Sequence, residues 1–338
     1  MYSAHVEPSG KEFTLKPGEY ILDAALRAGV PLKYGCRHGN CSSCKYLVTG
    51  GDVDYGNASP YSLSNAERDD GWVLVCCATA LEDIEIQDDR ILDLRQRPVL
   101  APEEFTAEVL GVNSLTPSLR RLRVRAGRPV YFYAGQFLEL AVPGEQDQWR
   151  SYSVASAPES ATDIEFVIKV TDGGRFSGQL DTLAPGTTLR MRGPFGTGYL
   201  REGTKPVLLV ATGSGISPIL SILEHAALTG DKRAFTFFYG ARTASDLPCE
   251  ARIRELTALL DLTYRPVLSR PTAECAWTTE PSRVTAVVLR TIGDGSPYDA
   301  YVCGNAGMCD AITALLEAKG TSEESIFTDK FFPAIEVD

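Results

Sequence analysis

Four cysteines near the N-terminus constrain this chain more than any other feature of its sequence. Cys36, Cys41 and Cys44 have the spacing C-x4-C-x2-C, and Cys76 follows after a further 31 residues. This spacing is typical of the plant-type ligands of a [2Fe–2S] cluster, in which each iron binds two thiolates. The loop 34–44 is rich in small residues, which lets backbone N–H groups approach the cluster sulfurs. We therefore predict that these four cysteines are metal ligands.

Three alternatives stay open at this site. A structural zinc site usually has two C-x2-C pairs, and this chain has only one. Cys77 could compete with Cys76, but neighbouring side chains of a strand point to opposite faces, so only one of them should face the cluster. The run Trp72–Cys77 (WVLVCC) resembles the ferredoxin pattern, whose ligand follows an apolar strand, and this favours Cys76. His38 is either a solvated loop residue or a Rieske-type ligand that lacks its usual second cysteine and histidine pair.

The composition is that of a globular protein from a reducing compartment. The 338 residues include 33 Lys and Arg against 44 Asp and Glu, and the formal net charge of −11 argues against general binding to nucleic acid. The count of nine cysteines is odd, and the sequence has neither a secretory signal peptide nor an apolar run of about 18 residues. We expect a cytoplasmic protein without membrane spans, whose cysteines are free thiols or metal ligands.

Two breaks divide the sequence into three predicted domains. The segment 88–102 is charged at first and then carries two prolines, and the segment 201–206 (REGTKP) precedes the most apolar strand-like run of the chain. The predicted domains are therefore 1–98, 99–203 and 204–338, with net charges of −5, −1 and −5. Each has enough residues to bury its own core.

The pattern of predicted elements differs between these domains. In the first, a helical pattern that ends at Gly29 lies among short strand-like runs and predicts a small α+β module. In the second, alternation such as that of 119–125 (LRRLRVR) predicts an antiparallel β-barrel. In the third, apolar strands alternate with helical patterns and predict an α/β parallel sheet with helices on both faces. Those helical patterns cover 219–227, 250–260 and 308–318.

Short motifs in the second domain favour a flavin. Arg150 could hold a phosphate, Tyr152 could stack on an isoalloxazine ring, and the Ser153 hydroxyl could hydrogen-bond its reactive edge. A glycine-opened stretch with a serine suits a pyrophosphate. A surface strand explains each motif alone, but their order favours FAD. The residues of that downstream stretch are Ile168, Lys169, Val170, Gly173, Gly174, Arg175 and Ser177.

A loop in the third domain favours a dinucleotide. The run ATGSGISP, which contains Gly213 and Gly215, follows an apolar strand and opens a helix. Pro218 replaces the last glycine of G-x-G-x-x-G at a first-turn position, where its missing N–H costs little. Arg242 and Cys303 end later strands, so three strand ends meet at the edge of the sheet where ligands bind.

With these motifs in order, the whole chain resembles the reductase components of bacterial multicomponent oxygenases. In that family a plant-type β-grasp ferredoxin domain is fused to an FAD-binding barrel and an NAD(P)-binding domain. The segment 51–78, together with Gly174–Ser177 (GRFS), is most similar to reductases of soluble di-iron monooxygenases such as the phenol, toluene and methane hydroxylases. Reductases of Rieske aromatic-ring dioxygenases share the architecture and are the alternative.

The resemblance implies a role for each motif. Arg150, Tyr152 and Ser153 would contact FAD, and Gly174 and Ser177 would hold its pyrophosphate. The loop with Pro218 would bind the nicotinamide dinucleotide, with Cys303 beside the nicotinamide ring.

The segment Phe327–Phe331 (FTDKF) resembles the F-x-E-K-F motif of the family. Phe331 would then cover the flavin, and Asp329 would replace the usual glutamate; an ordinary terminal strand is the other interpretation. The family usually has two prolines where this chain has Asn305 and Ala306, and a glycine where it has Thr212.

The resemblance also implies a route for electrons, from NADH through FAD and the cluster to the hydroxylase component of an oxygenase. NADH is favoured over NADPH because the segment 243–246 after Arg242 adds no second basic residue and ends in Asp246, which would repel a 2′-phosphate. A monomer is implied. A redox-sensing flavo-iron–sulfur protein is a more distant alternative.

Overall fold

The computed structural model describes residues 1–88, 95, 97–145, 148–160, 162–272, 277, 279–295 and 297–332. Cys275 and part of the predicted linker, residues 89–94 and 96, lie outside the described residues. The chain divides into two compact units, Met1–Glu103 and Glu104–Asp338. In the described part of the chain, no helix has the length and apolar character needed to cross a membrane.

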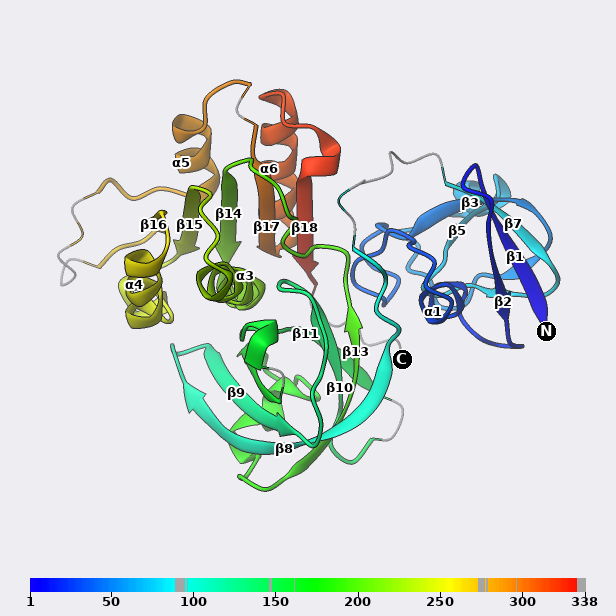
Figure 1. The fold of residues 1–338 in the computed structure, drawn as a ribbon, viewed down its shortest axis with the longest axis horizontal. Helices are drawn as coiled ribbons and strands as arrows, with labels where there is room; N and C mark the ends of the chain where they lie inside the picture. The colour runs from blue at the N-terminus through cyan, green and yellow to red at the C-terminus, as the bar shows by residue number, and fades with distance from the viewer. Residues whose placement is uncertain are drawn as a thin grey trace. The chain divides into compact units, whose positions relative to one another are not determined.

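The first unit is a mixed five-stranded sheet in the order β2-β1-β7-β3-β5 (Figure 1). β1 is antiparallel to β2 and parallel to β7, and β3 is antiparallel to both β7 and β5. Helix α1 (Ile21–Arg27) buries Leu22 and Leu26 and is followed by Gly29 at φ 75°, as the sequence predicted. One helix on such a sheet is a β-grasp fold. The strands are β1 (Tyr2–Glu7), β2 (Lys11–Leu15), β3 (Lys45–Gly50), β5 (Trp72–Leu74) and β7 (Ile84–Gln87).

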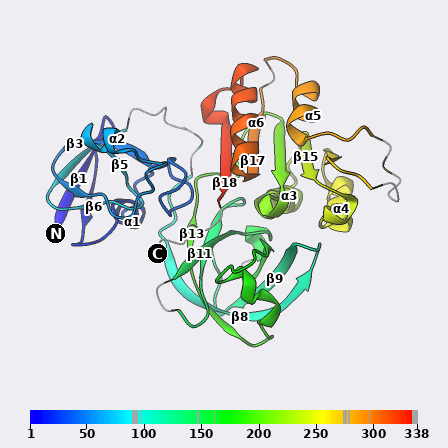
Figure 2. The ribbon, with the colours of Figure 1, turned by 180° about the vertical axis from the view of Figure 1, so that it is seen from behind.

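Small elements complete this unit. β4 (Val53–Asp54) pairs with β6 (Thr79–Ala80), and the short helix α2 (Asn65–Asp69) precedes β5 (Figure 2). Ser64 caps α2 and Glu67 closes the reciprocal hydrogen bond of a capping box. β4 and α2 lie in the chain between the third and fourth predicted ligands, Cys44 and Cys76, and β6 follows Cys76.

The second unit begins with a six-stranded sheet in the order β11-β10-β13-β8-β9-β12. A bridge between Val154 and Phe166 joins the two ends, so the sheet closes into a barrel whose interior is apolar. The predicted antiparallel barrel is confirmed, although the sequence analysis did not identify β8. The strands are β8 (Glu103–Ser114), β9 (Leu119–Ala126), β10 (Phe137–Ala141), β11 (Trp149–Ser153), β12 (Asp163–Lys169) and β13 (Thr188–Phe195).

A parallel five-stranded sheet in the order β16-β15-β14-β17-β18 forms the rest of this unit. Its central strands are apolar on both faces because helices cover both (Figure 1). Helices α3 and α4 cover one face, and α5 and α6 cover the other. Helices on both faces were predicted, but α5 was not among the predicted helical patterns. The elements are β14 (Val207–Thr212), α3 (Ile216–Thr229), β15 (Phe235–Ala241), α4 (Glu250–Leu259), β16 (Leu262–Leu268), α5 (Val284–Thr291), β17 (Asp299–Asn305), α6 (Ala306–Ala318) and β18 (Ile326–Phe331).

Candidate functional site

The cysteine loop of the first unit turns its backbone N–H groups toward sulfur. Arg37, Gly39 and Ser42 have positive φ angles of 63°, 73° and 57°, a conformation that turns the chain sharply. As a result the N–H of His38 donates to Cys36 Sγ at 3.4 Å, and the N–H of Cys36 donates to Cys41 Sγ at 3.3 Å. The His38 side chain is exposed.

The four predicted ligands lie as two pairs of sulfurs. Cys44 Sγ is 3.2 Å from Cys76 Sγ, and the Cys36 thiol hydrogen-bonds Cys41. This bond lowers the pKa of Cys41 to about 6, and hydrogen bonds from Cys44 and Cys77 likewise lower the pKa of Cys76. Among the described residues, no three His, Cys, Asp or Glu side chains converge as on one metal ion. The partner thiols, Cys36 and Cys44, donate these hydrogen bonds and have raised pKa values, so each pair holds one thiol that ionises readily. Two such pairs of sulfurs fit a [2Fe–2S] cluster, which takes two ligands on each iron.

The two adjacent cysteines do not lie in a strand. β5 ends at Leu74, and the N–H groups of Cys77 and Ala78 both donate to the Leu74 carbonyl, at 2.8 and 3.0 Å, in a turn. The sulfurs of Cys76 and Cys77 are consequently 3.6 Å apart and both buried. The expectation that strand alternation would point them to opposite faces is therefore wrong.

In the second unit, Ser153 and Asp329 meet at the junction of the barrel and the parallel sheet. The Ser153 hydroxyl, at the end of β11, donates to Asp329 Oδ2 on β18 at 2.9 Å. Asp329 pairs in register with Cys303 of β17, and Phe331 pairs with Asn305 at the end of the same two strands. Cys303 is buried, and burial raises its pKa well above the usual value. Ser153, Cys303, Asp329 and Phe331, which the sequence predicts to be the catalytic residues at the flavin and the nicotinamide, thus lie on adjoining strand ends.

Ser217 holds this junction together, and the sequence analysis gave it no role. It lies in the first turn of α3, where its hydroxyl donates to the Ser153 carbonyl at 2.6 Å and accepts the Val167 N–H at 3.1 Å. One buried side chain therefore links two barrel strands to the helix that follows the glycine loop. The run ATGSGISP contains this serine, and a serine in the first turn of a helix commonly hydrogen-bonds to backbone groups. Its position in the sequence could therefore have indicated such a role.

The remaining flavin-motif residues lie on β11, at the end of β12 and in the loop after β12. Arg150 is half-buried, and Tyr152 packs tilted on Phe176 with ring centroids 5.2 Å apart. Ile168 and Lys169 end β12, and the N–H of Val170 donates to the Ser118 carbonyl at 2.9 Å.

The glycines of the following turn provide space for a ligand. Gly173 has φ 70° with open space where a side chain would stand, whereas a side chain at Gly174 would overlap the Ser177 hydroxyl. Ser177 is buried and accepts the Thr171 N–H at 3.2 Å. Arg175 pairs with Glu145 at 3.1 Å. A compact turn with one open glycine fits a pyrophosphate.

The glycine loop after β14 lies against the end of β17. Gly213 has φ 56° and open space beside it, whereas a Cβ at Gly215 would overlap the Cys303 carbonyl. Only glycine therefore fits at 215. Thr212, which departs from the family pattern, accepts the Asn305 N–H through its hydroxyl at 3.4 Å. Pro218 is buried at the third position of α3, within the predicted first turn.

Arg242 lies at the end of β15 and is 70% exposed. Its Nε is 3.8 Å from Asp246 Oδ2. That oxygen also accepts hydrogen bonds from the N–H and the hydroxyl of Thr243, at 3.1 and 2.9 Å. The position of the carboxylate beside Arg242 is therefore fixed by the short turn after β15.

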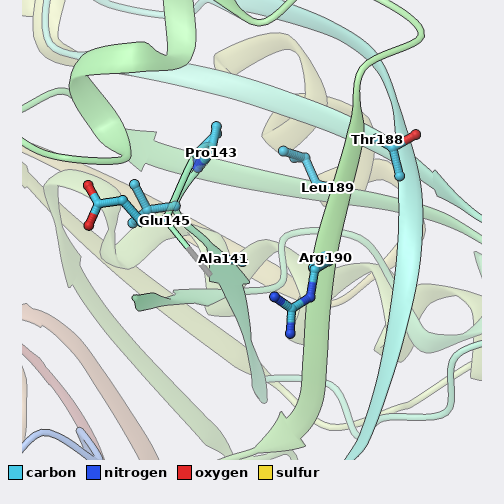
Figure 3. A pocket seen from close by; sticks show the side chains of 8 residues that line it. Ala141, Pro143, Glu145, Thr188, Leu189 and Arg190 are labelled. Atoms are coloured by element: carbon cyan, nitrogen blue, oxygen red, sulfur yellow. The ribbon is translucent and has the colours of Figure 1, made fainter. Parts of the chain in front are cut away.

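A cavity of about 270 Å³ lies elsewhere on the barrel (Figure 3). It is lined by residues from the end of β10 and the start of β13, among them Glu145, Leu189 and Arg190. No predicted site residue lines it. Ser153 pairs with Phe137, at the opposite end of β10.

A charge network that the sequence analysis missed also joins the barrel to the parallel sheet. Arg252 of α4 pairs with Glu165 of β12 at 2.9 Å and with Glu224 of α3. It also donates to the Ala155 carbonyl at 3.3 Å. Burial raises the pKa of Glu224, and the nearby Arg252 opposes that shift. No sequence motif marks this set of residues.

Comparison with known protein families assigns both units. Family models match the 2Fe-2S iron-sulfur cluster binding domain over residues 4–81, the oxidoreductase FAD-binding domain over 107–199 and the oxidoreductase NAD-binding domain over 209–314. The class of protein that the fold and these matches define is an iron–sulfur flavoprotein oxidoreductase.

Individual relatives match the chain over nearly its whole length. The reductase component of propane 2-monooxygenase from Rhodococcus jostii (strain RHA1) is 36% identical over 98% of this chain and 91% of its own. The phenol 2-monooxygenase reductase component of Pseudomonas sp. (strain CF600) is 34% identical over 98% and 95%. The crystal structure of an Amycolatopsis cytochrome P450 reductase has a TM-score of 0.87 at 29% identity, covering 98% of this chain and 99% of that chain.

The chain therefore belongs to the family of the reductase components of multicomponent monooxygenases. It is an NADH-dependent oxidoreductase that carries FAD and a [2Fe–2S] cluster and transfers electrons.

Proposed function

We propose that this reductase delivers electrons from NADH to the hydroxylase component of a soluble di-iron monooxygenase. The observation that carries the proposal is the 36% identity to a propane 2-monooxygenase reductase component over 98% of the chain. When bound, FAD would accept two electrons from NADH and supply them one at a time to the [2Fe–2S] cluster, a one-electron carrier. The residues of the chain then have to hold these groups, orient NADH and handle one proton.

Cys36, Cys41, Cys44 and Cys76 are the proposed cluster ligands. Their arrangement in two pairs and the N–H groups that point at their sulfurs support this assignment. The ligands are thiolates in the bound state, which requires a reducing compartment, and we propose the cytoplasm.

Ser153 and Asp329 are the proposed proton-handling pair at the flavin. The Ser153 hydroxyl already donates to the carboxylate at 2.9 Å, so Ser153 Oγ could pass its proton to Asp329 while it accepts one from the flavin edge, without any movement of either side chain. Burial of Ser153 and Cys303 keeps water from this edge. Phe331, at the end of β18, would cover the flavin.

Binding of the two nucleotides is proposed for the open glycines and the basic residues nearby. Arg150 and the turn with Gly174, Arg175 and Ser177 would hold the FAD pyrophosphate. The loop of Gly213, Gly215 and Pro218 would hold the NADH pyrophosphate, with Cys303 beside the nicotinamide. Support comes from the space at Gly173 and Gly213 and from the close packing of Gly215 on β17.

Asp246 is the residue that we propose selects NADH over NADPH. Its carboxylate is 3.8 Å from Arg242, partly neutralises this arginine and would face a 2′-phosphate with a like charge. The test is to compare the Michaelis constants for the two cofactors in the natural chain and in Asp246→Ser. A tenfold preference of the natural chain for NADPH would contradict the proposal.

The acceptor is proposed to dock on the acidic first domain, 1–98, which carries 10 Lys and Arg against 15 Asp and Glu. Opposite charge on the hydroxylase would steer association, so raising the ionic strength should slow reduction of the partner. We propose a monomer with boundaries near 98/99 and 203/204.

The deciding experiment mixes the purified reductase and NADH with hydroxylase components of propane, phenol and toluene monooxygenases, and in parallel with a Rieske oxygenase. We expect NADH oxidation coupled to product formation with one of the di-iron hydroxylases. Coupled turnover with the Rieske oxygenase alone would contradict the proposal.

A further inference from the structure

We propose that Cys77 raises the reduction potential of the [2Fe–2S] cluster by donating an S–H hydrogen bond to the ligand sulfur of Cys76. This inference rests on the proposed cluster site and deepens it. Cys77 itself is not a ligand in this proposal, and it acts through Cys76 as a positioning and tuning residue.

The geometry places Cys77 against one ligand. Its Sγ is 3.6 Å from Cys76 Sγ, within the range of a hydrogen bond between sulfurs. A sulfur bound to iron is a thiolate and can only accept, so Cys77 has to be the donor. Cys77 is 2% exposed, and water therefore cannot replace this donor when it is removed.

The chain around Cys77 is built to hold the sulfur in place. A Cβ at Gly39 would stand 2.8 Å from Cys77 Sγ, and a Cβ at Gly56 would overlap the Cys77 carbonyl. Both glycines have positive φ, 73° and 56°. The backbone N–H of Gly39 also hydrogen-bonds the sulfur of Cys76. The same short segment thus directs an N–H at the ligand and leaves room for the neighbouring thiol.

The expected consequence follows from charge. Reduction adds an electron to the cluster, and part of the added negative charge lies on the ligand sulfurs. A hydrogen-bond donor stabilises the reduced state more than the oxidised state, so its removal makes the cluster harder to reduce.

The test compares Cys77→Ala, which removes the donor, with Cys77→Ser, which keeps a donor. Cys249→Ala is the matched control, because it removes a half-buried thiol from the second unit. Each variant of the full chain is titrated against reductant while the cluster is followed by visible absorption and electron paramagnetic resonance. We expect Cys77→Ala to lower the equilibrium constant for reduction about tenfold, which for one electron is about 59 mV. Cys77→Ser should recover more than half of this loss, and Cys249→Ala should cause none.

The outcomes separate this inference from the cluster assignment. An unchanged potential in Cys77→Ala, with the cluster retained, would overturn the role of the hydrogen bond and leave the ligands as assigned. Loss of the cluster in Cys77→Ala but not in Cys76→Ala would make Cys77 the ligand and overturn both. If alanine prevents assembly, Cys77→Val supplies a second donor-free variant, and equal potentials for valine and serine would overturn the inference.

Discussion

The cluster loop and the Ser153–Asp329 centre differ in how far apart in the sequence their residues lie. Three of the four proposed cluster ligands lie between residues 36 and 44, and three left-handed residues within that loop aim its N–H groups. Ser153 and Asp329 are 176 residues apart and meet only because a barrel strand and the last strand of a parallel sheet end at the same place. A local motif therefore specifies the first site, whereas the second depends on the packing of the whole second unit.

The largest expected effect separates the two sites. Cys76→Ser removes one of four thiolates and should abolish cluster assembly, and with it reduction of cytochrome c. Reduction of ferricyanide by NADH through FAD should stay largely intact, because none of the residues around Ser153 changes. Visible absorption and steady-state rates with the two acceptors measure this.

The matched control is Cys309→Ala, which removes another buried thiol that is not a proposed ligand. It should keep the cluster. A Cys76→Ser chain that retains [2Fe–2S] absorption and reduces cytochrome c at the natural rate would show that Cys76 is not a ligand.

The second prediction affects the other site alone. Ser153→Ala removes the hydroxyl that donates to Asp329 and should slow flavin reduction by NADH on the order of 10²-fold, without loss of FAD or of the cluster. Stopped-flow absorption follows the flavin directly. Since the two groups act as a unit, Asp329→Asn added to Ser153→Ala should slow the reaction little further. An unchanged rate in Ser153→Ala would remove Ser153 from the mechanism.

This contrast explains what the sequence could predict. The ligand spacing, the helix that ends at Gly29 and the glycine loop before Pro218 are local patterns. The structure has the predicted helix α1 and the predicted loop before α3, and the ligand assignment remains a proposal. The barrel and the parallel sheet followed from alternation and from the order of strands and helices.

The predictions that were wrong or missing depended on individual hydrogen bonds and long-range contacts, which a sequence pattern does not show. Cys76 and Cys77 were assigned to a strand, but the Leu74 carbonyl accepts two N–H groups and turns the chain there. β8 was overlooked beside the prolines of the linker, although Phe105, Ala107 and Val109 alternate as buried residues. Ser217 and Arg252 act through partners far away in sequence, which only the folded chain reveals.

The third prediction tests how strongly the second unit depends on these distant contacts. Arg252→Met leaves Glu165 and Glu224 facing each other without their shared cation, and should lower the free energy of unfolding of this unit by about 2 kcal/mol. Urea unfolding followed by release of FAD gives the value. Arg254→Met, at an exposed position of the same helix, should change it little. Equal midpoints for the two variants would mean that the network does not stabilise the junction.

The smallest effect concerns a half-buried ion pair beside the cluster loop. Lys45, which follows Cys44, pairs with Glu67 of α2 at 2.5 Å, and the Ser64 N–H donates to the same carboxylate. These hydrogen bonds lower the pKa of Glu67 from its usual 4.5 to about 2. Because the folded pKa is the lower one, the stabilisation is complete above pH 4.5 and is lost as the pH falls toward 2.

Carboxyl NMR should therefore find Glu67 still ionised at pH 4.5. The variant Lys45→Met should move the pKa of Glu67 back toward 4.5, whereas the control variant Lys11→Met should not. Half-titration at pH 4.5 in the natural chain would show that the pair does not hold. The two partners of this pair are 22 residues apart in the sequence, whereas Ser153 and Asp329 are 176 residues apart. Contacts around the cluster loop therefore join residues that are closer in the sequence than those at the Ser153 junction.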